Sequence, residues 1–146
     1  MADLPIIYVL NGPNLNLLGT REPQIYGHDT LDEVEARLAL QAATLGVALT
    51  CRQSSHEGQL IDWLHEAHFA GAKAVLLNAG GYTHTSIALH DAIKSIRVPV
   101  IEVHLSDPEK RENFRHLSYI GMAATASFAG HGAASYTLAL DAAARL

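Results

Sequence analysis

The feature that most constrains the fold of this chain is a regular alternation of short apolar runs with helical patterns. Five runs are typical of β-strands, and several are almost continuously apolar, as strands are when helices cover both faces of a parallel sheet. They span residues 5–10, 47–52, 74–78, 98–104 and 123–128. The alternation predicts an α/β sandwich with right-handed connections around a parallel sheet.

Between these runs, apolar residues recur at helical spacing. The periodic positions are Leu31, Val34, Leu38 and Leu45, then Leu60, Ile61, Leu64 and Ala67, then Ile87, Leu89, Ile93 and Ile96. The first of these helices is expected to open after Asp29 or Thr30, and a last one to cover about residues 134–145. Asp107-Pro108-Glu109 is a helix-start signal, but residues 113–119 are only loosely helical in pattern. No repeat, linker or low-complexity tract interrupts the series, so we expect a single domain over residues 1–146.

Composition argues against several classes of function. The 146 residues carry a formal net charge of −5, whereas nucleic-acid-binding proteins usually show a basic excess. No apolar run reaches the roughly 18 residues of a membrane-spanning helix, and the first residues lack the pattern of a signal peptide. The single cysteine, Cys51, is more typical of a buried strand residue than of a nucleophile. We therefore expect a cytoplasmic protein that binds neither nucleic acid nor membrane.

Polar residues gather where the predicted strands end. The segments are 11–14, 53–58, 78–86 and 102–106, and each offers amide, imidazole or hydroxyl groups. In parallel α/β sheets, ligands bind beyond the carboxyl ends of the strands. These four segments therefore predict a pocket for a small, oxygen-rich ligand at that edge of the sheet.

The segment after the first strand contains a candidate base. A tyrosine alone is a poor base at neutral pH, because the ordinary pKa of a phenol is near 10, but a nearby guanidinium favours the phenolate. Arg21 lies five residues before Tyr26, in a segment with glycine and proline that can fold back. The spacing alone is more typical of a surface loop with a solvated arginine and a half-buried tyrosine.

A candidate acid stands at the end of the fourth strand. His104, as an imidazolium, can deliver a proton to a leaving oxygen, and Glu102 on the same face can orient the ring. A strand-end histidine with a purely structural role is an equal alternative. The turn that follows, Leu105-Ser106-Asp107-Pro108, presents backbone amides that suit a carboxylate.

Three other residues are weak site candidates when each is considered alone. Asn78 can hydrogen-bond to hydroxyls or to a carboxylate, and Arg115 either grips an anion or is a surface charge. Asp91, one to two turns into the third helix, is by itself typical of a solvated helix residue.

Several chemistries find little support in the sequence. Lys73, Lys94 and Lys110 all lie away from the carboxyl ends of the strands, which argues against a Schiff base. His65 and His68 are three residues apart instead of four and lack a third ligand, so we expect no metal site. The sequence has no Walker A loop, no dinucleotide fingerprint and no serine nucleophile elbow, and we expect no cofactor.

At these residues the chain resembles the type II 3-dehydroquinate dehydratases, cofactor-free enzymes of the shikimate pathway. The resemblance spans essentially the whole chain and rests on ordered motifs. They are Asn11-Gly12-Pro13-Asn14-Leu15-Asn16, Leu18-Gly19, Arg21-Glu22-Pro23, Tyr26-Gly27, Gln53-Ser54, Glu57-Gly58, Tyr82-Thr83-His84-Thr85-Ser86 and Glu102-Val103-His104-Leu105-Ser106. The resemblance implies a flavodoxin-like three-layer sandwich with sheet order 2-1-3-4-5, a hydro-lyase activity, and a homododecamer built as a tetramer of trimers.

The resemblance also implies roles for the site residues. Tyr26 would take the C2 proton of 3-dehydroquinate, with Arg21 holding it as the phenolate, and His104 would protonate the departing C1 hydroxyl of an enolate. Asn14 would lie near an ordered water that stabilises this enolate. The positions matching those that hold the substrate carboxylate are Asn78, Leu105 and Ser106, and those matching hydroxyl-binding positions are His84, Asp91 and Arg115, with Asp91 contributed by a neighbouring subunit.

The chain departs from the family pattern at three positions. Ala79 and Gly81 stand where the family usually has proline and alanine, and His131 stands where it usually has an aromatic residue. We expect Gly81 to loosen the loop that carries Asn78, with an effect on substrate affinity at most. Two other functions stay open: the same reaction in quinate breakdown, and a flavodoxin-like module that binds a small anion without catalysis.

Overall fold

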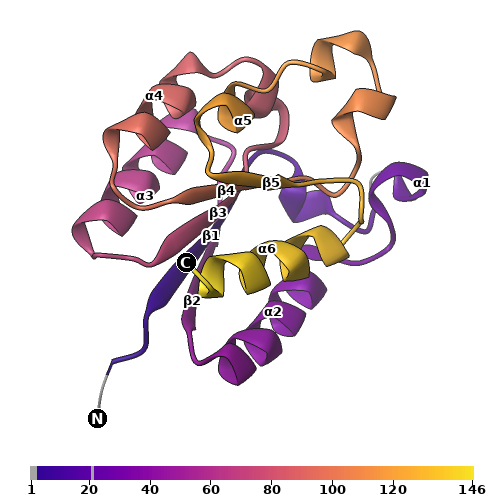
Figure 1. Ribbon diagram of the computed structural model, residues 1–146. Helices are drawn as coiled ribbons and strands as arrows, with labels where there is room; N and C mark the ends of the chain where they lie inside the picture. Colours follow the sequence, from indigo (N-terminus) through magenta and orange to yellow (C-terminus); the bar gives the residue numbers. More distant parts are fainter. Residues whose placement is uncertain (1–2, 21) are drawn as a thin grey trace.

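A five-stranded parallel sheet forms the centre of the computed structural model, which describes residues 3–20 and 22–146 (Figure 1). The strands are β1 (Ile6–Asn11), β2 (Ala48–Gln53), β3 (Ala74–Asn78), β4 (Val100–Val103) and β5 (Ala126–Phe128). They lie in the order β2-β1-β3-β4-β5, and each neighbouring pair is parallel. The predicted sheet and its order are confirmed.

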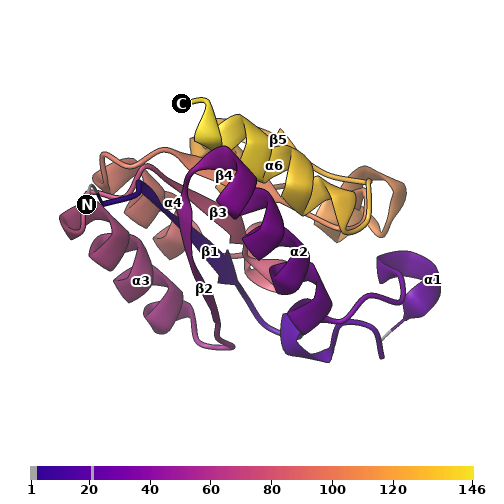
Figure 2. The same cartoon turned by 90° about the horizontal axis from the view of Figure 1, so that it is seen from below.

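Helices cover both faces of the sheet. The first face carries α2 (Leu31–Leu45) and α6 (Ala134–Ala144), which lie side by side, and the second carries α3 (Glu57–Phe69), α4 (Ile87–Ser95) and α5 (Tyr119–Ala123) (Figures 1 and 2). Successive side chains of a strand point to opposite faces, so Ile7 and Val9 pack in the core under α2 and α6, whereas Tyr8 and Leu10 pack under α3 and α4. The result is the predicted three-layer sandwich.

The helices α2, α4 and α5 begin at capping side chains. The Thr30 hydroxyl accepts a hydrogen bond from the backbone N–H of Glu33, so α2 starts where the sequence predicts, and it ends at Gly46 with a left-handed φ of 72°. Ser86 and Ser118 cap α4 and α5 in the same way as Thr30 caps α2. None of the helices in the described part of the chain is long and apolar enough to cross a membrane.

The connection from β4 to β5 differs most from the sequence expectation. The expected strand over residues 123–128 shortens to Ala126–Phe128, because the apolar residues before it form α5. Ile120 of α5 is fully buried in the core of the second face, which explains why this run is helical and packed instead of extended. The helix-start signal at Asp107 begins only a short 3-10 turn, η3 (Pro108–Lys110), and a second turn, η4 (Asn113–Arg115), follows it.

Three further short elements follow the carboxyl ends of the central strands. They are η1 (Leu15–Leu17) and α1 (Pro23–Tyr26) after β1, and η2 (Gly80–His84) after β3. The loops after β1 and β3 approach closely because glycines stand at the contact. A Cβ on Gly12 would lie 2.5 Å from the Ala79 carbonyl oxygen, and one on Gly80 would lie 2.9 Å from the Pro13 oxygen. This packing brings the polar ends of the strands to one edge.

Candidate active site

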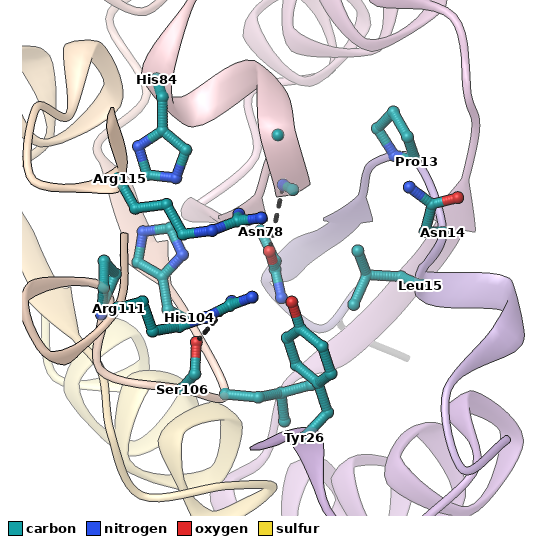
Figure 3. A pocket seen from close by; sticks show the side chains of 14 residues that line it. Pro13, Asn14, Leu15, Tyr26, Asn78, His84, His104, Ser106, Arg111 and Arg115 are labelled. Atoms are coloured by element: carbon teal, nitrogen blue, oxygen red, sulfur yellow. Dashed lines mark hydrogen bonds between the residues drawn. The ribbon is translucent and has the colours of Figure 1, made fainter. Parts of the chain in front are cut away.

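A cavity opens at the carboxyl edge of the sheet (Figure 3). It lies where the polar strand ends predict a pocket, and segments between residues 13 and 115 contribute to its wall. Its lining residues are Pro13, Asn14, Leu15, Tyr26, Asn78, Gly80, Gly81, His84, His104, Leu105, Ser106, Pro108, Arg111 and Arg115. The structure therefore brings together, in one place, eight of the site candidates: Asn14, Tyr26, Asn78, His84, His104, Leu105, Ser106 and Arg115.

A histidine and a carboxylate form a buried pair behind one wall. His104 Nε2 lies 2.7 Å from Glu102 Oε2, and the two side chains are only 11% and 6% exposed. Because a carboxylate can only accept, the imidazole donates its Nε2 proton to Glu102. His104 Nδ1 is then the ring nitrogen that remains for chemistry with a ligand in the cavity.

The carboxylate of Glu102 is held by two hydroxyls as well as by His104. Ser118 Oγ donates to Oε2, and Ser127 Oγ donates to Oε1 at 2.6 Å. Burial raises the pKa of Glu102, but the hydrogen bonds from His104 and the two serines, with the attraction to the histidine ring, outweigh burial and lower this pKa to about 2. Glu102 is therefore ionised at neutral pH and sets the tautomer and orientation of His104. Neither serine was predicted from the sequence as a site residue.

Tyr26 and a buried arginine meet at the opening of the cavity. Tyr26 ends α1, and its hydroxyl points toward the middle of the cavity (Figure 3). The guanidinium carbon of Arg111 lies 5.0 Å from the centre of the Tyr26 ring, which is cation–π distance. Arg111 Nη1 also donates to Ser106 Oγ at 3.3 Å, and the Arg111 side chain is only 13% exposed. Arg21, the cation expected beside Tyr26, lies outside the described residues.

Arg111 was not among the site residues predicted from the sequence. It stands in the charged run Lys110-Arg111-Glu112, which is typical of a solvent-exposed turn. The one signal that could have found it is its spacing of four residues from Arg115, a candidate already identified. In this irregular segment, however, spacing does not define a common face as it does in a helix.

Arg115 and His84 line another part of the wall. Arg115 Nε donates to Glu112 Oε1 at 3.1 Å, which fixes the stem of a side chain that is 21% exposed. His84 Nδ1 lies 2.8 Å from the Leu117 carbonyl, and because a carbonyl can only accept, Nδ1 carries the proton. Burial lowers the pKa of His84, against the hydrogen bond to Leu117, and the nearby His104 and Arg115 lower it further. The ring is therefore neutral at pH 7, with Nε2 as a hydrogen-bond acceptor.

Donors for an anion gather around the ends of β3 and β4. The Asn78 side chain is fixed by the Gly80 backbone N–H, which donates to Asn78 Oδ1 at 3.2 Å. The loop at residues 105–106 is anchored by its carbonyls, which accept from the backbone N–H groups of Gly132 and Gly130 at 2.9 and 3.1 Å. With the two arginine side chains nearby, this part of the cavity suits a carboxylate.

Asn14 and Asp91 lie in very different surroundings. Asn14 lines the cavity from the loop after β1 with a left-handed φ of 72°, a conformation that asparagine tolerates better than most residues. Asp91 does not line the cavity of its own chain. Its side chain is 68% exposed on α4, and Asp91 Oδ1 lies 2.9 Å from His90 Nδ1. Its expected role in the site of a neighbouring subunit stays a prediction.

The structure also bears on other candidates. Gly81 lines the cavity with open space around it, since a Cβ at this position would meet no atom within 4 Å. Burial, with a contribution from Glu35, raises the pKa of the Cys51 thiol to about 12, so this thiol is not a nucleophile at neutral pH. Within residues 3–20 and 22–146, no group of three or more His, Cys, Asp or Glu side chains could hold a metal ion.

Comparisons with known proteins, by sequence and by structure, agree on one family. The family described as dehydroquinase class II matches residues 5–144. A 3-dehydroquinate dehydratase of Rhodopseudomonas palustris (strain HaA2) is 58% identical over 134 residues, which cover 92% of this chain and 89% of that protein. A 3-dehydroquinate dehydratase of Caulobacter vibrioides is 59% identical over 137 residues, 94% of this chain and 93% of that protein. The crystal structure of type II dehydroquinase from Propionibacterium acnes superposes with a TM-score of 0.94 at 40% identity, covering 100% of both chains.

Proposed function

The chain belongs to the class II dehydroquinase family, and from that premise we propose that it is a 3-dehydroquinate dehydratase, a hydro-lyase that converts 3-dehydroquinate to 3-dehydroshikimate in the shikimate pathway. One observation carries the proposal: a phenol on α1 and an imidazole held by a carboxylate meet in one cavity that also contains anion donors. Elimination of water needs a base and an acid, and the substrate carries a carboxylate. We further propose that residues 1–146 act as a single catalytic domain.

The first step of the proposed mechanism is removal of a proton by Tyr26. The phenolate takes the proton at C2 of 3-dehydroquinate, beside the ketone, and the electron pair of the broken C–H bond forms an enolate. The guanidinium of Arg111 over the Tyr26 ring supports negative charge on the phenolate. Arg21 would supply a second cation, and Asn14 an ordered water for the enolate oxygen, as the family resemblance implies.

The second step is loss of the C1 hydroxyl. His104 protonates this hydroxyl through Nδ1, because Nε2 is bound to Glu102. The enolate collapses, a C1–C2 double bond forms in conjugation with the ketone, and water departs. Glu102 acts here as a positioning residue, since it does not line the cavity itself. In the anti elimination that we propose, Tyr26 and His104 act on opposite faces of the substrate ring.

The remaining cavity residues bind the substrate. The Asn78 amide and the backbone amides of Leu105 and Ser106 are proposed to hold the carboxylate. His84 Nε2, an acceptor in the neutral ring, is suited to the proton of a ring hydroxyl, and Arg115 donates to oxygen. These roles explain why the cavity combines cations and a neutral acceptor.

We also propose that subunits assemble so that Asp91 completes a neighbouring site, in a homododecamer of four trimers. Exposed apolar side chains support an interface close to Asp91: Ile87 on the same helix is 56% exposed, and Met122 on the adjoining α5 is 58% exposed. Mixing Asp91→Ala subunits with Tyr26→Phe subunits should restore part of the activity, because some hybrid sites then contain both native residues. No recovery in hybrids shown to form by mass spectrometry would refute the shared site.

The direct test follows the absorbance of the conjugated enone. Purified protein is mixed with 3-dehydroquinate, and turnover is expected without added metal or nucleotide. Treatment with borohydride in the presence of substrate, followed by removal of both, should leave the enzyme active, because none of the cavity-lining residues is a lysine that could form an imine. A folded protein that produces no enone would refute the proposed function, and loss of activity to borohydride would refute the mechanism alone.

A further inference from the structure

A polar cluster lies in the core directly behind the cavity. Tyr136 of α6 is 1% exposed, and Asn11 and Asn78, the last residues of β1 and β3, are 0% and 4% exposed. The two asparagines are partners in the register of these neighbouring strands, so their side chains leave the same face of the sheet, toward α6. Of the three, Asn78 lines the cavity.

The hydrogen bonds of this cluster run in one direction. The Gly80 backbone N–H donates to Asn78 Oδ1 at 3.2 Å, and Asn78 Nδ2 donates to the Tyr136 hydroxyl at 2.9 Å. The Tyr136 hydroxyl in turn donates to Asn11 Oδ1. A hydroxyl has a single proton, and because Tyr136 gives it to Asn11, the hydroxyl can only accept from Asn78.

From this geometry we infer that Tyr136 is a positioning residue that holds the Asn78 amide with its NH₂ group available to the substrate carboxylate. The inference rests on the proposed function, which makes Asn78 a carboxylate donor. One N–H of Nδ2 is used by Tyr136, and the second remains for an anion in the cavity. In a flipped amide the carbonyl oxygen would take the place of Nδ2 and would repel the carboxylate.

Asn11 supports the same orientation of the Asn78 amide. By accepting the proton of Tyr136, it prevents this hydroxyl from donating to the oxygen of a flipped Asn78. Flipping Asn78 would then break two hydrogen bonds at once, the buried one to Tyr136 and the partly buried one to Gly80. Burial raises the pKa of Tyr136, so its hydroxyl keeps its proton throughout the working pH range.

Stability alone does not explain the cluster. Within the described residues, Asn11 Nδ2 is buried and has no hydrogen-bond partner. A buried donor without a partner lowers the stability of a protein, and an apolar side chain would avoid that cost. Buried polar groups can serve to select one arrangement of side chains instead of adding stability. The arrangement selected here is the orientation of the Asn78 amide.

The test is the variant Tyr136→Phe, which removes only the hydroxyl. We expect KM for 3-dehydroquinate to rise by about three- to tenfold while kcat stays nearly constant, since Asn78 loses the partner that orients its amide toward the substrate carboxylate, whereas no group of the chemical step is changed. In an Asn78→Ala background, Tyr136→Phe should have no further effect on KM. The matched control is Tyr8→Phe, which removes the hydroxyl of another tyrosine with a buried ring, bonded at 2.7 Å to the partly exposed Glu66 on the other face of the sheet, and should leave KM unchanged.

A folded Tyr136→Phe protein with native KM would overturn the inference, and so would an equal rise in KM in the Asn78→Ala background. If Tyr136→Phe does not fold, Asn11→Leu provides the second variant. It leaves the hydroxyl of Tyr136 free to donate to a flipped Asn78, and it should raise KM in the same way. Native KM in folded Asn11→Leu would likewise count against the inference.

A readout without substrate separates this inference from the proposed function. In protein labelled with ¹⁵N-asparagine, the Asn78 side-chain NH₂ protons should show nuclear Overhauser effects to the Tyr136 ring. Their chemical shifts should change in Tyr136→Phe and stay unchanged in Tyr8→Phe. If the enzyme assay fails but these spectra behave as expected, the function is wrong and the positioning role stands. Unchanged Asn78 resonances in Tyr136→Phe would refute the positioning role whatever the activity.

Discussion

Replacing Glu102 by glutamine should reveal how much stability its buried charge contributes. The pKa of Glu102 falls from an ordinary value of 4.5 to about 2 in the folded protein. At about 1.4 kcal/mol per pKa unit, this difference corresponds to about 3 kcal/mol of folding free energy. Because the folded pKa is the lower one, this stability is complete above pH 4.5 and is lost as the pH falls toward 2.

The assay is urea unfolding of both proteins at several pH values and one fixed protein concentration. At pH 7 we expect Glu102→Gln to unfold with a free energy about 3 kcal/mol lower than the native chain. At pH 3 the native carboxyl has lost most of its advantage, and the difference should shrink to about 1 kcal/mol. Asp62→Asn, which removes an exposed carboxylate of α3, is the control and should show a small difference at every pH.

Two results would refute this reasoning. A difference in unfolding free energy that stays constant from pH 7 to pH 3 would mean that Glu102 binds its proton equally well in the folded and unfolded states. The absence of any difference at pH 7 would mean that glutamine satisfies Ser118, Ser127 and His104 as well as the carboxylate does. The same variant should lower kcat by about 10²- to 10⁴-fold, since a glutamine amide no longer selects the Nε2–H tautomer of His104.

Three further predictions concern the cavity and the loops that border it. Tyr26→Phe should reduce kcat by at least about 10²-fold while calorimetry still detects binding of 3-dehydroshikimate, and normal turnover would exclude Tyr26 as the base. Arg111→Met keeps the packing of the side-chain stem but removes the cation over the Tyr26 ring, so kcat should fall by about tenfold or more in steady-state assays. An unchanged kcat would show that this cation is dispensable. Gly12→Ala places a Cβ 2.5 Å from the Ala79 carbonyl oxygen, so thermal unfolding should show a loss of about 1–3 kcal/mol of stability. Gly58→Ala, which has open space around its Cβ, is the control and should lose no stability. Equal stability of the two variants would contradict the close approach of the loops.

The sequence alone predicted the elements that depend on burial. Strands covered on both faces must be apolar along their whole length, so the runs at residues 74–78 and 98–104 were visible as strands. Polar residues such as Asn78 and His104 then mark the points where the apolar runs end, and parallel strands bring these points to one edge. The order of the strands came from the family resemblance, because the apolar pattern of a strand does not say which strand lies beside it.

The features that the sequence did not predict depend on contacts between distant segments. Ser127 is 25 residues from Glu102 along the chain, and only the pairing of β4 with β5 brings its hydroxyl to the carboxylate. The sequence around Arg111 is typical of a solvent-exposed turn, but the connection before β5 places its guanidinium over the Tyr26 ring. The strand predicted at residues 123–128 loses its first residues to the end of α5, because burial of Ile120 holds this helix in the core. In each case local composition is ambiguous and tertiary packing decides.

The two halves of the cavity are oriented from opposite layers of the sandwich. On the side of α5, Glu102 accepts from Nε2 of His104 and so leaves Nδ1 for the substrate. On the side of α6, Tyr136 accepts from Asn78 and so fixes which end of the amide faces the cavity. Both supports place a polar group in the core, where it costs stability unless it is fully paired. A loop residue at the surface could form the same hydrogen bonds, but its freedom to move would not select one tautomer or one amide orientation. The need for that selection explains why the supporting groups lie on strands and helices while the residues that meet the substrate lie at their ends.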